Sequence, residues 1–192
     1  SDGTVTPLDT VGSGGDTPIS VAAWGNLVYV LNANNVTGFT VQGNDLVPLA
    51  GSTEPLSANL PNPAQVSFSP NGGLVVVTEK DTNIISTYVV GADGTLTGPN
   101  AQASAGTTPF GFAFDDLGFL IVSEAFMGAA NASATSSYSV NAGGDLTVIS
   151  PSVGTTETAA CWVVTIPGFA YVTNTGSASV SGYSVSNTGV LT

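Results

Sequence analysis

Residues 159–185 read AACWVVTIPGFAYVTNTGSASVSGYSV, and this stretch contains three short segments with strand character. The first two, WVVT and FAYVT, are largely apolar and are separated by the turn sequence IPG. An Asn and a run of small polar residues then lead to SVSGYSV, in which large and small residues alternate. Short apolar segments interrupted by Gly and Pro are typical of antiparallel strands. The stretch therefore predicts three consecutive β-strands.

The same pattern occurs four times along the chain. The units begin at Pro18, Pro63, Pro109 and Ala159, about 45 to 50 residues apart. Each unit has a short apolar strand, a turn, a second strand that is apolar throughout, a polar loop, an alternating third strand and a turn into a fourth. A repeat of this length is typical of a four-stranded propeller blade. We therefore predict an all-β fold, a β-propeller with about four blades of four antiparallel strands.

The repeats also define the expected organisation of the chain. We predict a single domain over residues 1–192, with blade units at about 18–62, 63–108, 109–158 and 159–192. Residues 1–17 match the fourth-strand segment of a unit and are predicted to be the outer strand of a preceding blade. Both ends are expected to be cut from something longer. Four units could close as a four-bladed ring, but part of a ring of six or seven is favoured, because four is the low extreme for propellers.

Charge is sparse in this chain. Only 7% of its residues are charged, against roughly 25% in a typical soluble domain, and it has 13 acidic residues, Lys80 as its one cation and no histidine. A net charge of −12 excludes nucleic acid as an expected partner, because almost nothing here can neutralise phosphates.

The rest of the composition bears on location. Ser, Thr and Asn replace the missing charges, and such a surface favours an extracellular or cell-surface location. The sequons at Asn35 and Asn131 leave glycosylation open. No run of about 20 apolar residues occurs, so no membrane insertion is expected. The single cysteine, Cys161, excludes an internal disulfide.

One polar position recurs at the end of each predicted second strand. It is occupied by two amides and two carboxylates: Asn32 in YVLN, Glu79 in VVTE, Glu124 in IVSE and Asn174 in YVTN. If the blades are related by rotation, these side chains lie on the same rim of the propeller. They could accept hydrogen bonds from loop N–H groups and so tie one blade to the next.

Two other interpretations of this rim remain open. Carboxylate and amide oxygens are hard ligands suited to Ca²⁺, so Asn32, Glu79, Glu124 and Asn174 could form a metal site that Asp81 might complete. Alternatively, Glu79 and Glu124 could be an acid–base pair, with Lys80 stabilising an oxyanion or a substrate carboxylate. Lys80 could equally form an exposed ion pair with Asp81 or Glu79.

Aromatic residues occupy one register of the predicted third strands: Phe39, Tyr88, Tyr138 and Tyr183. Packing between blades is the expected role of these rings. Common catalytic patterns are missing, because without histidine there is no Ser-His-Asp or Cys-His arrangement, and one cysteine is too few for a zinc site.

Several segments resemble the bacterial β-propeller lactonases, the 6-phosphogluconolactonase and carboxymuconate-cyclase-like group with YVTN repeats. The resemblance rests on PAQVSFSPNG, LVVVTEKDTNIISTYVV, TPFGFAFDDLGFLIVSEAF and TAACWVVTIPGFAYVTNTGSASVSGYSV, and it extends over nearly all of residues 1–192. It implies a seven-bladed ring of which this chain is an internal piece. It also implies lactone hydrolysis or cycloisomerisation of a small lactone or sugar acid. The chain departs from the family pattern because it has neither the His nor the Arg that the enzymes bring to their site.

Two functions therefore stand as hypotheses. The first is a lactonase-like enzyme that uses Glu79, Glu124 and Lys80. The second is a non-catalytic extracellular scaffold that associates with itself or with other proteins through exposed strand edges.

Overall fold

The structure is a computed structural model that describes residues 3–192. Among these residues, regular structure consists of β-strands and two single turns of 3-10 helix, η1 (Phe126–Gly128) and η2 (Thr175–Ser177). The strands form four separate antiparallel sheets. This confirms the predicted all-β class.

Each sheet is built from strands that are consecutive in the chain, and apart from β5 each strand pairs with the one that follows it. The first sheet contains β1 (Pro18–Trp24), β2 (Leu27–Asn32), β3 (Asn35–Gln42), β4 (Asp45–Pro48) and the short β5 (Glu54–Pro55), which pairs with β3. The second contains β6 (Pro63–Phe68), β7 (Leu74–Glu79), β8 (Ile84–Val90) and β9 (Leu96–Ala103). The third contains β10 (Pro109–Phe114), β11 (Leu120–Glu124), β12 (Ala134–Val140) and β13 (Leu146–Gly154). The fourth contains β14 (Ala160–Ile166), β15 (Phe169–Asn174) and β16 (Ser179–Ser184).

A glycine shapes the turn between the first and second strands of every sheet. These glycines have positive φ, a conformation that residues with a Cβ rarely adopt. They are Gly25 (60°), Gly72 (70°), Gly118 (89°) and Gly168 (79°). The recurring turn sequences WGN, PNGG, DDLG and IPG therefore have one backbone requirement in common.

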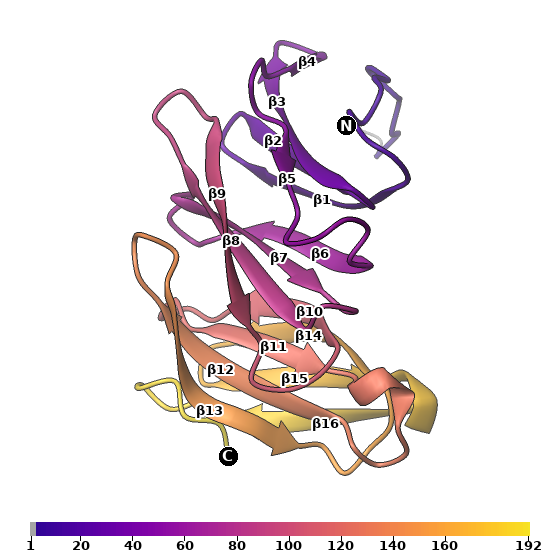
Figure 1. Ribbon diagram of the computed structural model, residues 1–192, viewed down its shortest axis with the longest axis vertical. Helices are drawn as coiled ribbons and strands as arrows, with labels where there is room; N and C mark the ends of the chain where they lie inside the picture. The colour runs from indigo at the N-terminus through magenta and orange to yellow at the C-terminus, as the bar shows by residue number, and fades with distance from the viewer. Residues whose placement is uncertain (1–2) are drawn as a thin grey trace.

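The four sheets follow one another along an open arc, with the N-terminus and the C-terminus at opposite ends (Figure 1). The first strands lie innermost, where β1 contacts β6, β6 contacts β10 and β10 contacts β14. This is the arrangement of a partial β-propeller. The ring is not closed within the chain, because the first and fourth sheets are the two ends of the arc (Figure 1).

Three apolar cores hold the sheets together, one in each interface between neighbours. Val75 and Val77 of β7 belong to the core against the first sheet, whereas Val76 belongs to the core against the third. β11 repeats this division, because Leu120 faces the second sheet and Ile121 faces the fourth. All residues of β7 and β11 are buried. The apolar residues of these two second strands are explained by the position of both faces in a core.

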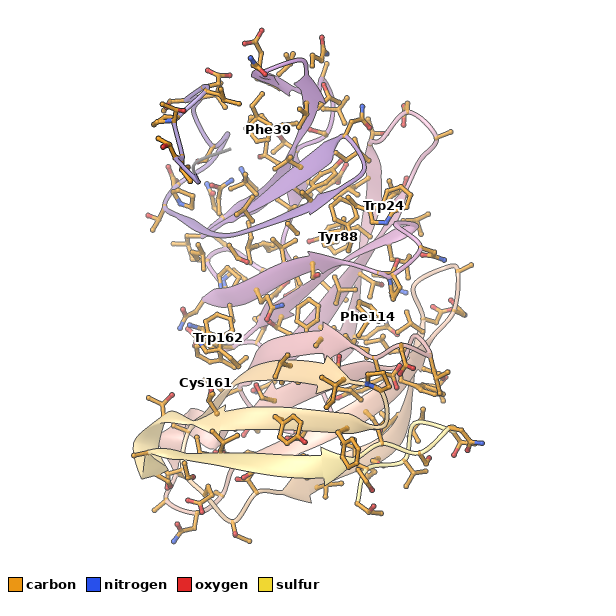
Figure 2. The ribbon with its side chains drawn as sticks, turned by 180° about the vertical axis from the view of Figure 1, so that it is seen from behind. Trp24, Phe39, Tyr88, Phe114, Cys161 and Trp162 are labelled. Atoms are coloured by element: carbon orange, nitrogen blue, oxygen red, sulfur yellow. The ribbon has the colours of Figure 1, made fainter. Side chains whose placement is uncertain are left out.

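The third-strand aromatic residues are buried, as predicted. Tyr88 donates its hydroxyl to the Pro55 carbonyl at 2.8 Å, and Tyr183 donates to the Val153 carbonyl at 3.0 Å. Phe39 and Tyr138 are also buried, and Phe39 and Tyr88 are labelled in Figure 2. These rings fill space between strands and, where a hydroxyl is present, fix the chain that passes over them.

The fourth sheet and residues 3–17 differ from the prediction of complete blades. The fourth sheet has three strands, followed by a single antiparallel bridge between Val185 and Leu191. Residues 3–17 contain no strand, although residues 1–17 were predicted to be one; residues 1 and 2 lie outside the described part of the chain. A strand needs a partner to accept and donate its backbone hydrogen bonds, and within the described residues no strand forms a ladder with residues 3–17. Within residues 3–192, no helix is long and apolar enough to cross a membrane.

We expect Ile121→Ala to destabilise the protein by about 2–5 kcal/mol, because it opens a cavity in the core between the third and fourth sheets. Urea unfolding monitored by circular dichroism measures the change. The matched control is Met127→Ala, since Met127 is 89% exposed; its effect should stay within about 0.5 kcal/mol. Equal effects of the two substitutions would contradict the assigned core.

Candidate functional site

The predicted rim residues all end a second strand. Asn32 is the last residue of β2, Glu79 of β7, Glu124 of β11 and Asn174 of β15. All four side chains are buried. They therefore occupy equivalent places at the same end of four different sheets.

Glu124 accepts hydrogen bonds on both carboxylate oxygens. The Gly106 N–H donates to Oε1 at 2.8 Å, and the Ser152 hydroxyl donates to Oε2 at 2.6 Å. The Ser136 hydroxyl also donates to Oε1. Gly106 lies in the segment that leaves the second sheet, so Glu124 joins the third sheet to the chain arriving from its neighbour. Burial raises the pKa of the Glu124 carboxyl, although the hydrogen bonds from Ser136, Ser152 and Gly106 offset part of this effect.

Glu79 is held in the same way one sheet earlier. The Ser86 hydroxyl donates to Oε1 at 2.7 Å, and the Ser57 N–H donates to the same oxygen at 3.1 Å. The Thr82 hydroxyl donates to Oε2 at 3.1 Å, and the Ser57 hydroxyl is a further donor. Ser57 lies in the segment between the first and second sheets. Each glutamate is thus a buried acceptor that links two parts of the chain.

The two asparagines occupy this position with fewer partners. The Asn32 amide N–H donates to the Ser13 carbonyl at 3.2 Å and to Asn35 Oδ1 at 2.8 Å. The Asn174 amide donates to the hydroxyl of Ser181 at 2.9 Å. The Oδ1 atoms of both asparagines are buried and have no hydrogen-bond partner among residues 3–192. In the first and fourth sheets an amide therefore takes the place of the carboxylate. The hydrogen-bond partners of these two asparagines differ from those of Glu79 and Glu124.

A backbone hydrogen bond accompanies the side chain in all four sheets. The residue after each rim residue donates its N–H to the carbonyl of a positive-φ residue that precedes the first strand. The pairs are Ala33 with Thr17 (3.2 Å), Lys80 with Asn62 (3.2 Å), Ala125 with Thr108 (2.9 Å) and Thr175 with Ala159 (2.9 Å). Side chain and backbone together fasten the end of the second strand to the start of the first.

The contacts of the rim residues bear on the predicted metal site. They lie in four different sheets, and no group of three or more acidic or cysteine side chains within residues 3–192 could hold a metal ion. The carboxylate oxygens of Glu79 and Glu124 already accept hydrogen bonds from neighbouring N–H and O–H groups. Asp81 Oδ1 instead accepts from the Asn62 amide at 3.1 Å. These contacts agree with the hydrogen-bonding interpretation of the rim, and the Ca²⁺ site stays a prediction.

Lys80 lies near aromatic rings rather than beside a carboxylate. Its Nζ is 5.0 Å from the centroid of the Phe110 ring, and the Phe110 ring meets the Trp162 ring edge to face at 5.4 Å. Within the described residues Lys80 forms no salt bridge, so the anticipated ion pair with Asp81 or Glu79 is not observed. Contact with the ring face stabilises the ammonium group by cation–π attraction.

A pocket of about 470 Å³ borders Lys80. Its other lining residues are polar or flexible: Asn62, Asp81, Asn83, Thr107, Thr108 and Met127. Neither Glu79 nor Glu124 lines it, because both carboxylates are enclosed by their hydrogen-bond donors. The three residues predicted to act together in catalysis are therefore not brought together around this pocket.

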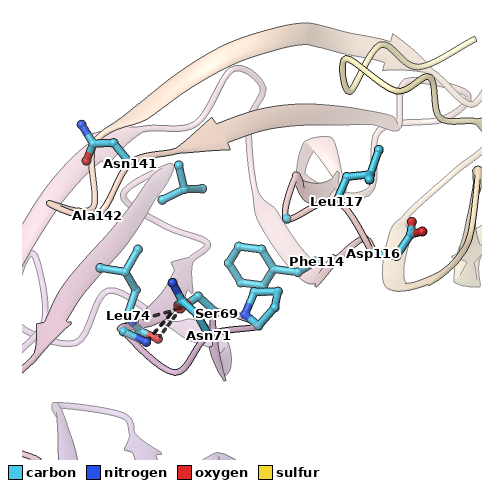
Figure 3. Close-up of a pocket in the computed structure, with 12 residues that line it drawn as sticks. Ser69, Asn71, Leu74, Phe114, Asp116, Leu117, Asn141 and Ala142 are labelled. Carbon is cyan, nitrogen blue, oxygen red and sulfur yellow. Dashed lines mark hydrogen bonds between the residues drawn. The ribbon is translucent and has the colours of Figure 1, made fainter.

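A second pocket, of about 390 Å³, opens at the other end of the second and third sheets (Figure 3). Its walls come from residues 69–74, 114–118 and 140–142. The Ser69 hydroxyl accepts a hydrogen bond from the Leu74 N–H at 3.0 Å and donates one to Asn71 at 2.8 Å, so Ser69 and Asn71 stabilise the turn between β6 and β7 (Figure 3). No residue that the sequence singled out for catalysis lines this pocket.

Several solved structures have a fold similar to that of this chain. Over 91% of its length the chain matches the periplasmic gluconolactonase of Pseudomonas aeruginosa, with 18% identity and a TM-score of 0.72, and covers 52% of that chain. The chain has the fold of the β-propeller lactonases. A putative 6-phosphogluconolactonase from Bacteroides uniformis gives the same TM-score of 0.72 at 13% identity, again over 91% of this chain and 52% of that one. The chain thus spans about half the length of these propellers.

A third match has nearly this chain's own length. The computationally designed Ika4 protein is covered over 92% of its length by 89% of this chain, with 11% identity and a TM-score of 0.63. No family model matches the sequence, and no curated protein matches it. At these identities the structural likeness establishes the fold, and the four sheets are hereafter called blades.

Sequence reasoning missed two features of this propeller. The first is a hydroxyl two residues before each third-strand aromatic, at Thr37, Ser86, Ser136 and Ser181. Three of these hydroxyls bond directly to the rim residue of their own blade, and Thr37 bonds to Asn35, which in turn accepts from Asn32. The pattern of Ser or Thr, any residue, then Phe or Tyr was the available signal.

The second missed feature is the outer face of the fourth blade. Along β14, β15 and β16 exposed and covered residues alternate, and the covered set packs on the third blade. The exposed set includes large apolar side chains, which we call the outer face: Val164 (58% exposed), Ile166 (50%), Phe169 (47%), Tyr171 (38%) and Val180 (64%). Cross-strand pairing places Val164 opposite Tyr171 and Ile166 opposite Phe169, so these residues form one surface.

We expect the stability of the wild type, relative to Glu124→Gln, to fall as pH rises. A carboxyl with a raised pKa in the folded chain favours folding below its unfolded pKa of about 4.3. That contribution is lost as pH rises through the folded-state pKa, whereas Gln does not titrate. Gln can keep the Gly106 and Ser136 bonds on its oxygen and donate to Ser152 from its nitrogen, so the fold should persist.

Urea unfolding of both proteins between pH 3 and pH 8 tests this expectation about Glu124. The difference in unfolding free energy between wild type and variant should shrink or change sign with increasing pH. A difference that grows with pH would mean that the folded protein favours the ionised carboxylate.

Proposed function

We propose that this propeller is a non-catalytic interaction module that works outside the cell or at the cell surface. The observation that carries the proposal is the outer face of the fourth blade. Monomeric soluble proteins rarely leave a large contiguous apolar surface in water, and such surfaces commonly mark sites of protein association. The five side chains of this face lie on regular strands, so the surface is preformed.

The chemistry of the face favours another protein surface as its partner. Its side chains are branched aliphatic and aromatic, and Gly182 lies beside Tyr171, where a Cβ would stand 3.2 Å from the ring. The face carries no charged residue among its members, so it can be dehydrated without stranding an ion. It is one face of an antiparallel sheet, and a second sheet can pack on such a face.

The enzyme alternative has weaker support in the geometry. Glu79 and Glu124 are buried and surrounded by donors, which makes them poor candidates for contact with a substrate. Lys80 borders a pocket that neither glutamate reaches. The extracellular setting rests on composition, because 7% charged residues and a Ser/Thr/Asn-rich surface suit secreted proteins better than a typical intracellular domain.

Hydrolysis of simple aldonolactones tests the non-catalytic assignment. Purified protein of residues 1–192 and the Glu79→Gln/Glu124→Gln double variant should both leave the rate at that of buffer alone, followed by proton release at constant pH. A rate above buffer with the wild-type chain would overturn the proposal. If the double variant then lost that rate, the two glutamates would be assigned to catalysis.

A further inference from the structure

We propose that the groove between the first and second blades binds the ring of a neutral sugar, with Trp24 as the surface on which the ring stacks. The groove is a pocket of about 390 Å³, which lies within the roughly 300–1,000 Å³ of small-molecule sites. Leu27, the first residue of β2, lines it, whereas the rim residue Asn32 ends that strand. The groove is therefore at the opposite end of the blades from the rim. This inference concerns a surface other than the outer face and goes beyond the proposed function.

Three turns form the walls of this groove. They are the turn between β1 and β2 in the first blade, the equivalent turn between β6 and β7 in the second blade, and the turn between β8 and β9. The lining residues belong to segments 24–27, 71–73 and 90–94, together with Thr40. All of these segments lie in the first two blades, so both walls of the groove are contained in residues 18–103.

The alternation of β1 directs Trp24 towards the second blade (Figure 2). The Ser20 hydroxyl accepts the Val66 N–H at 3.2 Å, and Ala22 packs on the core between the two blades. Trp24 is the next residue on that side of the strand. A Cβ at Gly72 would collide with three adjacent ring atoms of Trp24, namely Cδ2, Cε2 and Cε3. One face of the indole therefore rests on the glycine backbone, and 45% of the residue remains exposed.

The fold of the turn does not require this tryptophan. The equivalent turns of the other blades, PNGG, DDLG and IPG, contain no aromatic residue, although each has a glycine with positive φ as WGN does. The indole is therefore an addition specific to the first blade, in a place where a ligand can contact it.

The turn between β8 and β9 is held in place by hydrogen bonds to both blades. The Tyr29 hydroxyl donates to the Gly94 carbonyl at 2.6 Å, which fastens this turn to the first blade. The Thr95 hydroxyl and N–H donate to Asp93 Oδ1 at 2.8 and 3.1 Å. These two bonds lower the pKa of the Asp93 carboxyl, so this group is an anion at neutral pH. Among residues 3–192 no hydrogen bond reaches its Oδ2 atom, so the groove has a fixed acceptor on this wall.

Hydrogen-bond donors line the groove together with this acceptor. Within the described residues 3–192, neither the Trp24 Nε1–H nor the Asn26 side-chain amide has a hydrogen-bond partner. Asn71 uses its Oδ1 atom to accept the Gly73 N–H at 3.0 Å, and its Nδ2 atom has no partner in that part of the chain. The groove thus presents an indole N–H, two amides and a carboxylate oxygen that a ligand can bind.

The ring of a neutral sugar matches this mixture of groups. Each sugar hydroxyl both donates and accepts, so one ring can bond to the Asp93 carboxylate and to the N–H donors around it. The C–H groups on one face of the ring form an apolar surface that can pack on the indole of Trp24. A quaternary ammonium ion can also lie on an indole. It accepts no hydrogen bond, however, and would cover the Trp24 and Asn71 donors without pairing them, so the groove favours the sugar.

Tryptophan fluorescence tests the groove without altering it. The chain has two tryptophans, so in a Trp162→Phe background all indole emission comes from Trp24. Glucose, galactose, mannose and N-acetylglucosamine are titrated separately, and at least one should shift the emission to shorter wavelength with a Kd of about 1 mM, because the ring covers an exposed indole. Tetramethylammonium chloride should leave the emission unchanged. The proposal is overturned if no sugar shifts the emission at about 100 mM, a hundredfold excess over that Kd, or if tetramethylammonium alone shifts it.

Ligand-observed NMR then measures the affinity of variants for the sugar that shifts the emission. Trp24→Ala should weaken binding at least about tenfold. Asp93→Asn should also weaken it, because Asn keeps Oδ1 for Thr95 and loses the Oδ2 acceptor. The matched control Trp162→Ala removes the other exposed tryptophan (53%) and should leave the affinity unchanged.

Circular dichroism checks that each of these variants is folded. Unchanged affinity in Trp24→Ala, or a loss confined to Trp162→Ala, would place the sugar elsewhere and overturn the proposal. These outcomes are distinct from failure of the proposed function, because none of the four sugars is a lactone and lactone hydrolysis is measured separately.

Discussion

The second strand of each repeat has two apolar faces, and the rest of the architecture follows from the need to cover both. Val75 and Val77 require a neighbour on one side of β7, and Val76 requires one on the other. A single four-stranded sheet cannot meet this requirement, so the repeats become stable only by stacking. Stacking around an inner row of first strands gives the arc of a propeller. An apolar sheet face that no neighbouring blade covers remains exposed, as the outer face of the fourth blade illustrates.

Contacts between the blades at the rim depend on hydrogen bonds of buried polar side chains rather than on salt bridges. Glu124 and Glu79 are buried acceptors for serine and threonine hydroxyls and for a backbone N–H from the segment before their own blade. The asparagines at the same place in the end blades keep part of this network and leave an amide oxygen unpaired. The rim is thus one repeated structural device in which a carboxylate and an amide are alternatives. Its regularity shows that residues singled out as catalytic candidates also hold neighbouring segments together through hydrogen bonds.

The fold was predictable from the sequence because its causes are local and repeated. Turn glycines, fully apolar second strands and alternating third strands each leave a pattern, and four copies of that pattern reinforce one another. The site was less predictable. Glu79 and Glu124 lie at the ends of second strands, as the sequence predicted, but their hydrogen-bond donors Ser57 and Ser152 lie in a loop and in an outer strand that carry no distinctive pattern. The exposed outer face could not be anticipated, because β14–β16 have the same alternation as strands that are covered on both sides.

The scarcity of positive charge has a consequence for how this protein responds to its solvent. Lys80 is the one cationic side chain of the sequence and lies over the ring of Phe110, and residues 3–192 contain no salt bridge that salt could weaken. Thirteen acidic groups repel one another across the surface, and dissolved ions shield that repulsion. Salt therefore relieves an unfavourable interaction in the folded chain without weakening a favourable ionic one. Concentrated salt, which weakens surface salt bridges in other proteins, should leave the buried hydrogen bonds at the rim of these blades intact.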